Sequence, residues 1–187
     1  VIRLSALLSG KPTATLFVSR LSVDQHQHVG FDIRRHRVIP NGFDCDVFRP
    51  SPSARKMIRK ELNVEEHHVL IGLLARYHPM KDHRNFLEAA ARLAALRPEV
   101  RFMLAGTGVD TDNSELIQLI TAHGISDRVD LLGERKDVSA LLSALDILCC
   151  SSFGEAFPLI VGEAMASGVP CVVTDVGDTA WLVGETG

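Results

Sequence analysis

Short apolar runs alternate with amphipathic segments along most of the chain from residue 69 onward. Consecutive apolar residues are typical of buried strands, whereas apolar positions three and four residues apart are typical of helices with one buried face. The runs predict strands at 69–74, 101–105, 129–132, 147–150 and 169–174. A helical pattern follows each of the first four runs, and no hairpin turn joins two strands. The pattern therefore predicts an α/β fold with a doubly wound, Rossmann-like parallel sheet.

Capping residues, glycine and proline predict where the helices begin and end. Asp82 is a suitable N-cap for a helix over 82–96, whose apolar positions form one buried face. Gly124 ends the next helix, and residues 138–145 form the third. Pro158 is expected in the first turn of a fourth helix, where its missing N–H costs nothing. No helix is expected after the last predicted strand.

Residues 1–40 do not have the pattern of an independent folding unit. They contain two short strand patterns, 15–19 and 37–39, with a polar helical segment between them. A turn cluster at 40–44 follows, and a short helix is expected at 54–62. We therefore do not expect the first 40 residues to carry a core of their own.

The composition is that of an ordinary globular domain. The chain has 187 residues, of which 46% are hydrophobic, and a formal net charge of −3. A chain of this length buries roughly 70% of its unfolded surface, so it needs no disulfide or metal for stability. The mild acidity, with a pI near 6.2, argues against nucleic acid as a partner. No run approaches the roughly 18 apolar residues of a transmembrane helix.

Cysteine and histidine usage predicts a reducing compartment and no zinc site. The four cysteines lack C-x-x-C spacing, and three of them, Cys149, Cys150 and Cys171, lie in predicted strands. Free thiols in a cytoplasmic protein are the expected interpretation, also for Cys45. The eight histidines form no metal-ligand pattern with cysteines or carboxylates. The first eight residues lack a basic leader and an initiating Met, which indicates a cut fragment and not a signal peptide.

The stretch 151–170 connects two predicted strands through a helix and carries the main candidate chemistry. Glu155 falls in the loop before the helix, and Glu163 falls inside it. The free N–H groups of the first helical turn, at Leu159 and Ile160, point out of the carboxyl edge of the sheet, where the helix dipole favours an anion. Two carboxylates thus flank an anion site. This arrangement suits a ligand with hydroxyls at both ends and a phosphate between them, such as a nucleotide sugar.

The residues around both carboxylates resemble a family signature. Glu155 lies in Ser-x-x-Glu-Ala-Phe-Pro-Leu, and Glu163, after seven intervening residues, begins Glu-Ala-Met-Ala-Ser-Gly-x-Pro. This resembles the E-x7-E signature of the retaining GT-B glycosyltransferases of family 4, although Ala156 replaces the more frequent glycine. The resemblance implies that Glu163 binds the ribose hydroxyls and that Glu155 lies near the donor sugar. The donor contacts expected in this stretch are Phe157, Pro158, Leu159, Ile160 and Glu163.

Ligands of open parallel sheets bind outside the carboxyl ends of the strands. Five loops follow the predicted strands and are expected to assemble one site: 76–81, 106–108, 133–136, 151–155 and 174–177.

In the first of these loops, Arg76 and Lys81 place two cations across a turn, where they can grip a diphosphate from two sides; the alternative is a solvated basic turn. The resemblance makes Arg76, Lys81 and Glu155 the expected catalytic residues, with the cations neutralising the leaving nucleoside diphosphate. A front-face mechanism, in which the diphosphate receives the acceptor proton, is preferred to Glu155 as a nucleophile.

Glycines in two other loops are expected to admit the donor. Gly106 and Gly108 let the backbone approach a ligand. Gly133 and Arg135 belong to the loop expected to hold the nucleobase, mainly through backbone groups. Thr111 stands where a dinucleotide fingerprint would need its third glycine, which argues against a Rossmann dehydrogenase.

Two D-x-D triplets, 44–46 and 110–112, raise the alternative of a divalent metal on the diphosphate. Their contexts favour a turn for Asp44 and a helix cap at Asp112 or Asn113. We therefore expect no metal site and no cofactor, with Arg76 and Lys81 in place of the ion.

The resemblance also implies a domain organisation. Val-Ile-Pro-Asn-Gly-Phe-Asp at 38–44 marks the passage from an amino-terminal acceptor domain to a carboxyl-terminal donor domain. Residues 1–40 are then a remnant of the acceptor domain and linker. Residues 41–187 are the nucleotide-sugar-binding donor domain, truncated before the closing helix. The chain is expected to form one half of a GT-B two-domain fold.

The implied function is hexosyl transfer from a nucleoside diphosphate sugar to a glycan or lipid-linked acceptor, as in polysaccharide biosynthesis. The isolated chain is expected to bind the donor without transferring it. The full-length enzyme is expected in the cytoplasm, with peripheral contact to the inner face of the membrane as an option. Two alternatives stay open: a GT-B epimerase or hydrolase of nucleotide sugars, and a non-catalytic sugar-nucleotide-binding module.

Overall fold

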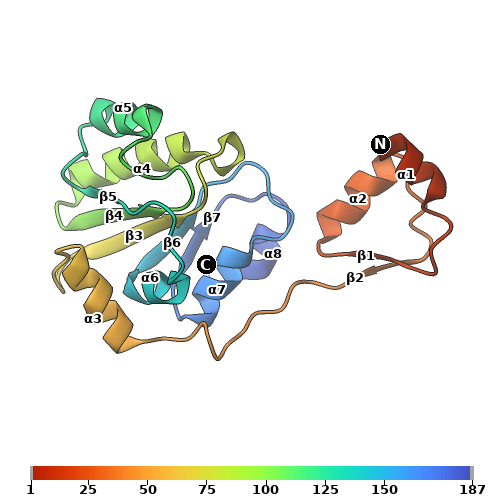
Figure 1. The fold of residues 1–187 in the computed structure, drawn as a ribbon, viewed down its shortest axis with the longest axis horizontal. Helices are drawn as coiled ribbons and strands as arrows, with labels where there is room; N and C mark the ends of the chain where they lie inside the picture. The colour runs from red at the N-terminus through yellow and green to blue at the C-terminus, as the bar shows by residue number, and fades with distance from the viewer. Residues whose placement is uncertain (1, 186–187) are drawn as a thin grey trace.

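The computed structural model describes residues 2–185 and is drawn in Figure 1. Most of the chain is built on a five-stranded parallel sheet with the order β5-β4-β3-β6-β7. The strands are β3 (Val69–Leu74), β4 (Val100–Ala105), β5 (Val129–Leu131), β6 (Ile147–Cys150) and β7 (Cys171–Val173). Each strand agrees with its apolar run to within a few residues at its ends. The predicted doubly wound α/β fold is confirmed.

The strand order reverses direction between β3 and β6. The chain begins the sheet at β3, adds β4 and β5 on one side, and then adds β6 and β7 on the other. β3 and β6 are hydrogen-bonded neighbours, with Ile71 opposite Ile147 and Gly72 opposite Leu148. The connections after these two strands therefore leave the carboxyl edge toward opposite faces, which creates the crevice where open α/β sheets bind ligands.

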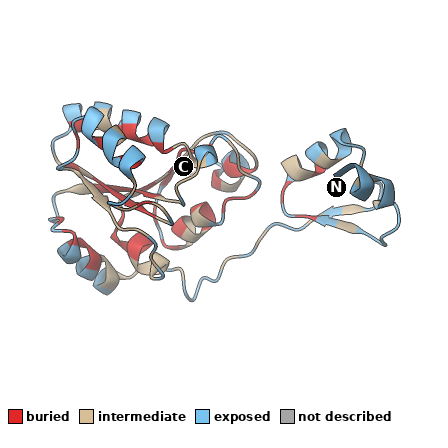
Figure 2. Ribbon diagram, turned by 45° about the horizontal axis from the view of Figure 1, so that its top comes forward, coloured by how far each residue is buried: buried red, intermediate tan, exposed pale blue. Residues whose placement is uncertain are grey.

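Helices cover both faces of the sheet (Figure 1). On one face, α3 (Pro52–Glu61), α6 (Val138–Ala144) and α7 (Leu159–Ala166) share an apolar cluster with the strands. On the other, α4 (His83–Leu96) and α5 (Ser114–Ala122) form a second cluster. Figure 2 shows the buried residues gathered in the strands and on the helix sides that face them.

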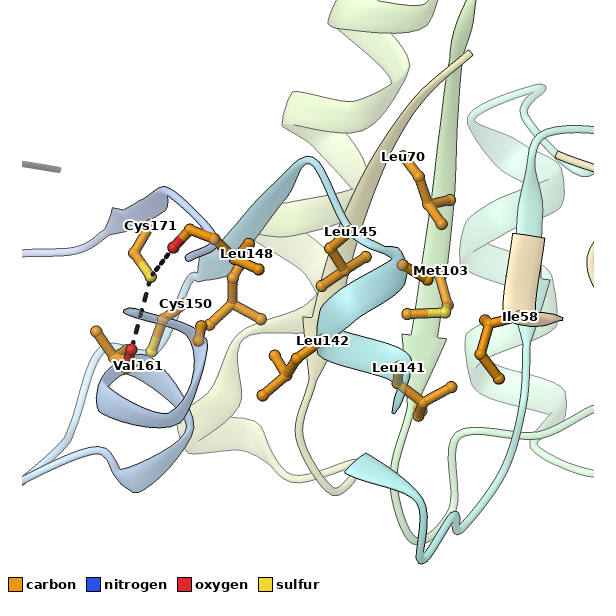
Figure 3. Close-up of a cluster of buried hydrophobic side chains, with 14 of the residues drawn as sticks. Ile58, Leu70, Met103, Leu141, Leu142, Leu145, Leu148, Cys150, Val161 and Cys171 are labelled. Atoms are coloured by element: carbon orange, nitrogen blue, oxygen red, sulfur yellow. Dashed lines mark hydrogen bonds between the residues drawn. The ribbon is translucent and has the colours of Figure 1, made fainter. Parts of the chain in front are cut away.

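Figure 3 shows the first of these clusters, where Leu141, Leu142 and Leu145 lie beside Leu70 and Met103. The central strands β3 and β4 are buried on both faces, which explains why they are nearly continuous apolar runs. The apolar runs that predicted these strands thus arise because helices cover both faces of the sheet.

Helix boundaries agree with the capping signals, with one shift. The Asp82 carboxylate caps α4 by accepting the Asn85 N–H at 3.2 Å. Gly124, after the end of α5, has a φ of 67°. Pro158 was expected in the first turn of its helix, but it immediately precedes α7 as the N-cap residue. Its ring fixes φ near the value needed there, and Leu159 becomes the first helical residue.

A helix follows the last strand, which corrects the sequence-based expectation. α8 (Thr179–Val183) has five residues, and Val183 and Leu182 pack on the first apolar cluster. A helix of one and a half turns is too short to repeat an apolar position, so its sequence carries no helical pattern. The truncation of the domain before a closing helix stays a prediction.

Residues 2–38 form a smaller unit beside the sheet domain (Figure 1). It contains α1 (Ile2–Leu8), α2 (Arg20–His28) and a parallel pair of strands, β1 (Thr15–Phe17) and β2 (His36–Val38). Phe17 and Val23 are its buried apolar residues among those described, and no residue of α1 is buried. The unit therefore has a small apolar core, and the origin of these residues in an acceptor domain stays a prediction.

None of the helices in residues 2–185 combines the length and the apolar character that crossing a bilayer requires.

Candidate functional site

The loops after β3 and β6 meet at the carboxyl edge of the sheet, where the strand order reverses. Lys81 and Glu155, one from each loop, form an ion pair with Nζ 2.5 Å from Oε1. The Ser152 hydroxyl donates to the same carboxylate oxygen at 2.7 Å. The Lys81 and Glu155 side chains are 25% and 11% exposed, so both charges are largely withdrawn from water. The structure therefore brings together two of the three residues predicted to be catalytic.

Further hydrogen bonds join the loop after β3 to the loop after β6. The Ser151 hydroxyl lies 2.9 Å from the Lys81 carbonyl oxygen and 3.1 Å from that of Asp82, so it can donate to either. The Phe153 N–H donates to the Met80 carbonyl oxygen at 3.1 Å. Asp82 takes a left-handed conformation, with a φ of 50°, between the short turn that ends at Lys81 and the start of α4. The backbone of Lys81 is thus fixed against the loop that carries Glu155.

A cavity of about 370 Å³ opens beside the ion pair. It is lined by the three predicted catalytic residues, Arg76, Lys81 and Glu155, and by four predicted donor contacts at the start of α7. These four contacts are Phe157, Pro158, Leu159 and Ile160. The remaining lining comes from β3, β6 and their ends: Leu73, Leu74, Ala75, Cys149, Cys150 and Ser152. Seven predicted site residues therefore share one cavity, although their roles stay predictions.

Positive charge and free backbone donors face this cavity. Arg76 is exposed, and in the part of the chain that the structure describes its guanidinium forms no ion pair. At the other wall, Pro158 gives α7 no side-chain cap, so the first-turn amides of Leu159 and Ile160 are available. An arginine, a lysine and a helix N-terminus converging on one space suit an anion.

A second cavity of about 250 Å³ adjoins the first, and both are lined by Leu74, Ala75, Arg76 and Ile160. Other residues of its lining come from the loop after β4, the loop after β5, and helices α6 and α7. They are Gly106, Thr107, Glu134, Arg135, Val138, Leu141 and Glu163, with Ala105 at the end of β4. We call the two cavities together the hollow: Arg76 lines both of its parts, and each part has one carboxylate, Glu155 in the first and Glu163 in the second.

Glu163 is half-buried, and this burial raises the pKa of its carboxyl above the usual value. Within residues 2–185 no side chain or backbone N–H donates to this carboxylate. A partly buried carboxylate without a donor is poorly solvated, so it favours a ligand that brings hydroxyl groups.

Only one of the three predicted glycines lines the hollow. At Gly106, with a φ of 151°, a Cβ would lie 2.2 Å from the Ala75 carbonyl oxygen, so no other residue fits between β3 and β4 at this point. Gly108 and Gly133 lie outside the lining of both cavities. The Gly133 N–H donates to Val109 O and its carbonyl oxygen accepts from Gly106 N–H, both at 2.8 Å. Gly133 thus joins the loops after β4 and β5, and its predicted ligand contact stays a prediction.

Arg135 lines the second cavity, but two carboxylates already engage its guanidinium. Asp137 accepts from Nε at 2.8 Å and from Nη2 at 2.7 Å, and Glu61 of α3 accepts from Nη1 at 2.6 Å. These hydrogen bonds raise the pKa of Arg135 above its ordinary value. The side chain therefore anchors the loop after β5 to α3, and it offers little free charge to a ligand.

The fifth predicted loop, 174–177, does not line either of these two cavities, and its place in the site stays a prediction. It packs behind the loop that carries Glu155. The Thr174 hydroxyl donates to the Ser152 carbonyl oxygen. At Gly177, with a φ of 61°, a Cβ would lie 2.1 Å from the Glu155 carbonyl oxygen. This loop supports the site from outside.

The structure adds polar residues that sequence reasoning did not single out. Ser152 bonds to Glu155, and the Thr107 hydroxyl donates to Glu134 at 3.1 Å beside the second cavity. The spacing Ser-x-x-Glu contains a local signal for the first contact, because a serine three residues before a carboxylate can turn back to it. The second contact joins residues 27 positions apart and has no local signal.

Both D-x-D triplets have the local roles expected for them. The Asp44 carboxylate accepts the N–H groups of Asp46 and Val47, at 3.0 and 3.2 Å, in a turn. Asn113 caps α5 by accepting the Leu116 N–H at 3.1 Å. Among the described residues, no three His, Cys, Asp or Glu side chains are grouped so that they could hold a metal ion.

The cysteines are free thiols, as expected. Cys149 and Cys150 line the first cavity. Burial raises the pKa of Cys149 to about 11, so its thiol is protonated near neutral pH and unreactive.

Comparison with known proteins agrees with this geometry. Residues 54–186 match the family described as glycosyl transferases group 1. The chain is 30% identical over 148 residues to the UDP-Gal:alpha-D-GlcNAc-diphosphoundecaprenol alpha-1,3-galactosyltransferase of Escherichia coli, covering 78% of this chain and 38% of that protein. It is 35% identical over 166 residues to the D-inositol 3-phosphate glycosyltransferase of Geodermatophilus obscurus, covering 80% of this chain and 35% of that protein.

A solved structure extends the likeness to the amino-terminal unit. The crystal structure of HepE from Anabaena in complex with UDP and glucose matches with a TM-score of 0.87 and 29% identity, covering 100% of this chain and 51% of that chain. The chain thus spans between about a third and a half of the length of these relatives. The family match covers well over half of the chain, so the chain belongs to the glycosyl transferases group 1 family.

Proposed function

We propose that this chain is the donor-binding half of a retaining GT-B glycosyltransferase of family 4. The full enzyme moves a hexose from a nucleoside diphosphate sugar to a glycan or lipid-linked acceptor. The observation that carries the proposal is the hollow at the reversal of strand order, whose two parts are both lined by Arg76 and contain the carboxylates of Glu155 and Glu163. The UDP bound in the related HepE structure supports a uridine nucleotide as the first donor to test.

The lining of the hollow suggests how the donor lies in it. The diphosphate occupies the middle, between Arg76, Lys81 and the free amides of Leu159 and Ile160. Each charge-assisted hydrogen bond there contributes about 1.5–3 kcal/mol. The ribose hydroxyls donate to Glu163, whose carboxylate accepts no hydrogen bond from the residues that the structure describes.

The two ends of the hollow receive the other parts of the donor. The hexose extends into the first cavity toward Glu155, and the nucleobase lies in the second cavity near Thr107 and Glu134. This placement uses both carboxylates as acceptors for hydroxyl groups and leaves the cations to the phosphates.

The proposed reaction proceeds on one face of the hexose. The bond between C1 and the β-phosphate oxygen breaks, and its electron pair stays on that oxygen. Arg76 and Lys81 stabilise the charge that develops there, more strongly in the transition state than in the bound donor. The acceptor hydroxyl oxygen bonds to C1 from the side that the phosphate leaves, and its proton passes to the departing diphosphate. The configuration at C1 is therefore retained.

Glu155 has a supporting role in this proposal. It is bonded to Lys81 and Ser152, which fix its carboxylate beside the first cavity, where it accepts from the sugar without attacking C1. Two cations and a helix N-terminus supply positive charge to the diphosphate, and on this basis we propose that donor binding needs no metal and no cofactor.

The isolated chain is proposed to bind the donor without transferring the sugar. In the family that it resembles, the acceptor is bound by the amino-terminal domain, across the cleft from the donor. The full-length enzyme is proposed to act in the cytoplasm, with contact to the inner face of the membrane where its acceptor is lipid-linked.

Calorimetric titration tests the donor site directly. The chain is titrated with UDP, GDP and ADP, each with magnesium and with a chelator, alongside Lys81→Ala, Glu163→Ala and the exposed control Arg92→Ala on α4. We expect one nucleotide to bind equally in both buffers, with an affinity about tenfold weaker or more in the two site variants and unchanged in the control. Binding that disappears in chelator, or that both site variants leave intact, contradicts the proposal.

The enzymatic alternative is less well supported. An epimerase or hydrolase needs its own acid and base, and the sequence offers His78 as the extra candidate. Its ring Nδ1 accepts the Met80 N–H at 3.2 Å, and it lies outside the lining of both cavities. Product analysis with a full-length protein separates the three functions: a lengthened glycan, a changed sugar, or no product for a binding module.

A further inference from the structure

The amino-terminal unit contacts the sheet domain at the residue that precedes α8. The Asp178 carboxylate accepts the backbone N–H groups of Arg20 at 2.8 Å and Leu21 at 3.3 Å, the first two residues of α2. The Ser19 hydroxyl accepts the Ser22 N–H at 3.1 Å. The first three N–H groups of α2 are thus all bonded, two of them to a side chain of the other unit. Asp178 is 4% exposed, so these hydrogen bonds are shielded from water.

An aromatic contact meets the same end of α2. The Arg20 guanidinium lies over the Trp181 ring, 4.7 Å from its centroid. The Trp181 ring lies 6.5 Å from that of Phe157, which stacks on Phe43 of the linker at 6.1 Å. A polar and an aromatic contact, from two residues of one short segment, therefore hold α2.

The same segment is bonded to the loop that carries Glu155. The Asp178 N–H donates to the Ala156 carbonyl oxygen at 3.1 Å. Gly177 packs so closely on the Glu155 carbonyl oxygen that a Cβ would lie 2.1 Å from it. Phe157, which contacts Trp181, lines the first cavity. Asp178, whose carboxylate accepts from the first residues of α2, is thus joined by one backbone hydrogen bond to Ala156, the residue after Glu155.

We propose that Asp178 and Trp181 form a latch through which the amino-terminal unit sets the position of loop 152–157. Both are positioning residues for Glu155, because neither lines the hollow. Asp178 acts through Ala156, the next residue, and Trp181 acts through Phe157, two positions from Glu155. A shift of α2 moves the Asp178 carboxylate, and the Asp178 backbone moves with it against Ala156. The consequence for donor binding rests on the proposed function, whereas the coupling itself does not.

Exchange of individual backbone amides, measured by NMR on the full 187-residue chain, tests the coupling without a ligand. Two reporter amides are those of Phe153, bonded to Met80 O, and of residue 178, bonded to Ala156 O. In Asp178→Ala we expect both to exchange about tenfold faster, together with those of Arg20 and Leu21. Amides in the centres of β3 and β4 keep their rates, which shows that the chain is folded.

Three further variants sharpen the test. Asp178→Asn keeps an acceptor oxygen and is expected to restore most of the protection. Arg20→Ala removes only the contact with Trp181 at an exposed position, and about threefold faster exchange is expected at the reporters. Asp24→Ala removes an exposed carboxylate of α2 and serves as the control with unchanged rates. Faster exchange confined to Arg20 and Leu21, with both reporters unchanged, overturns the latch and leaves Asp178 as a simple cap.

Nucleotide titration of the same variants tests the functional consequence. UDP-glucose, whose hexose is proposed to contact Glu155, is expected to bind about three- to tenfold more weakly to Asp178→Ala than to Asp24→Ala or the unmodified chain. If the unmodified chain binds no nucleotide, the proposed function fails, and the amide exchange still decides the latch. If the reporters exchange faster and UDP-glucose binds equally well to every variant, the positioning role of Asp178 for Glu155 is wrong.

Discussion

The Lys81 ammonium and the Glu155 carboxylate meet at 2.5 Å between the loops that diverge from β3 and β6. This pair determines how much free positive charge the unliganded hollow offers. Arg76 has no carboxylate partner in the described chain, whereas Lys81 is held by a neighbour that is only 11% exposed. An arriving diphosphate therefore binds Arg76 directly but competes with Glu155 for Lys81.

Replacing Glu155 by Gln is expected to tighten UDP binding by the chain, by roughly threefold to tenfold. The substitution keeps the size of the side chain and removes the charge that competes with the diphosphate for Lys81. Calorimetric titration of Glu155→Gln measures the change, with Glu88→Gln on the exposed face of α4 as the control for loss of one negative charge. Weaker binding in Glu155→Gln is the contrary result, because it means that the carboxylate holds Lys81 in its binding position.

Replacing Glu163 by Gln is expected to stabilise the unliganded chain at pH 7 and to weaken UDP binding. Burial raises the pKa of Glu163, so the folded state disfavours the ionised carboxyl relative to the unfolded state. This cost is present above the folded-state pKa and vanishes below the ordinary value of 4.5. The thermal midpoint of Glu163→Gln is expected to exceed that of the unmodified chain by about one to two degrees at pH 7, with partial exposure limiting the gain.

The pH dependence separates charge from packing in this experiment. At pH 4 the two midpoints are expected to coincide, because the carboxyl is then protonated in both the folded and the unfolded chain. An equal gain at pH 7 and pH 4 shows that the amide stabilises through its own contacts, and it removes the argument from burial. If Glu163→Gln stabilises the chain and also weakens UDP binding, Glu163 behaves as expected for a binding-site residue, whose substitution gains stability at the expense of function.

His83 predicts a second pH effect, of opposite sign. Burial leaves it 3% exposed and lowers its pKa from 6.5 to about 4. The unfolded chain therefore takes up this proton first, and the free energy of unfolding falls as the pH drops from 6.5 toward 4. Between pH 7 and pH 4.5 the loss from this residue is roughly 2 kcal/mol.

Urea unfolding at pH 7 and pH 4.5 measures this contribution. His83→Phe keeps a ring beside Tyr77 but has no proton to bind, so it is expected to lose roughly 2 kcal/mol less than the unmodified chain over this interval. His28→Phe, at an exposed position, is the control. Its free energy of unfolding is expected to change between the two pH values by as much as that of the unmodified chain. Equal acid sensitivity in all three proteins argues that His83 is solvated or protonated in the folded state.

Much of the fold could be predicted because the buried strands are apolar on both faces. β3 and β6 agree with their apolar runs at both ends, and Asp82 starts α4 where the capping signal placed it. The five-residue helix α8 was missed, since so short a segment has no period. A strand that is buried on both faces therefore has a recognisable apolar run, whereas a helix of about one turn has no recognisable pattern.

The side chains that pair with one another were harder to predict than the loops that form the site. The carboxyl ends of the strands identified Arg76, Lys81 and Glu155 as neighbours, because parallel strands bring those ends to one edge. The pairing of Lys81 with Glu155 joins residues 74 positions apart, and so does that of Arg135 with Glu61. Such contacts depend on the path of each loop and on helix packing, which no local pattern contains.

Substituting Gly162 by Ala is expected to destabilise the chain by about 1–3 kcal/mol through its contact with the linker. A Cβ there would lie 2.0 Å from Phe43 Cζ, so the ring must move away from α7 and from Phe157, on which it stacks. In Phe43→Ala the obstacle is absent, and the same glycine substitution is expected to cost less than about 0.5 kcal/mol. Urea unfolding of the two single variants and the double variant measures this coupling. Additive losses contradict it, because they mean that the linker ring does not rest on Gly162 in solution.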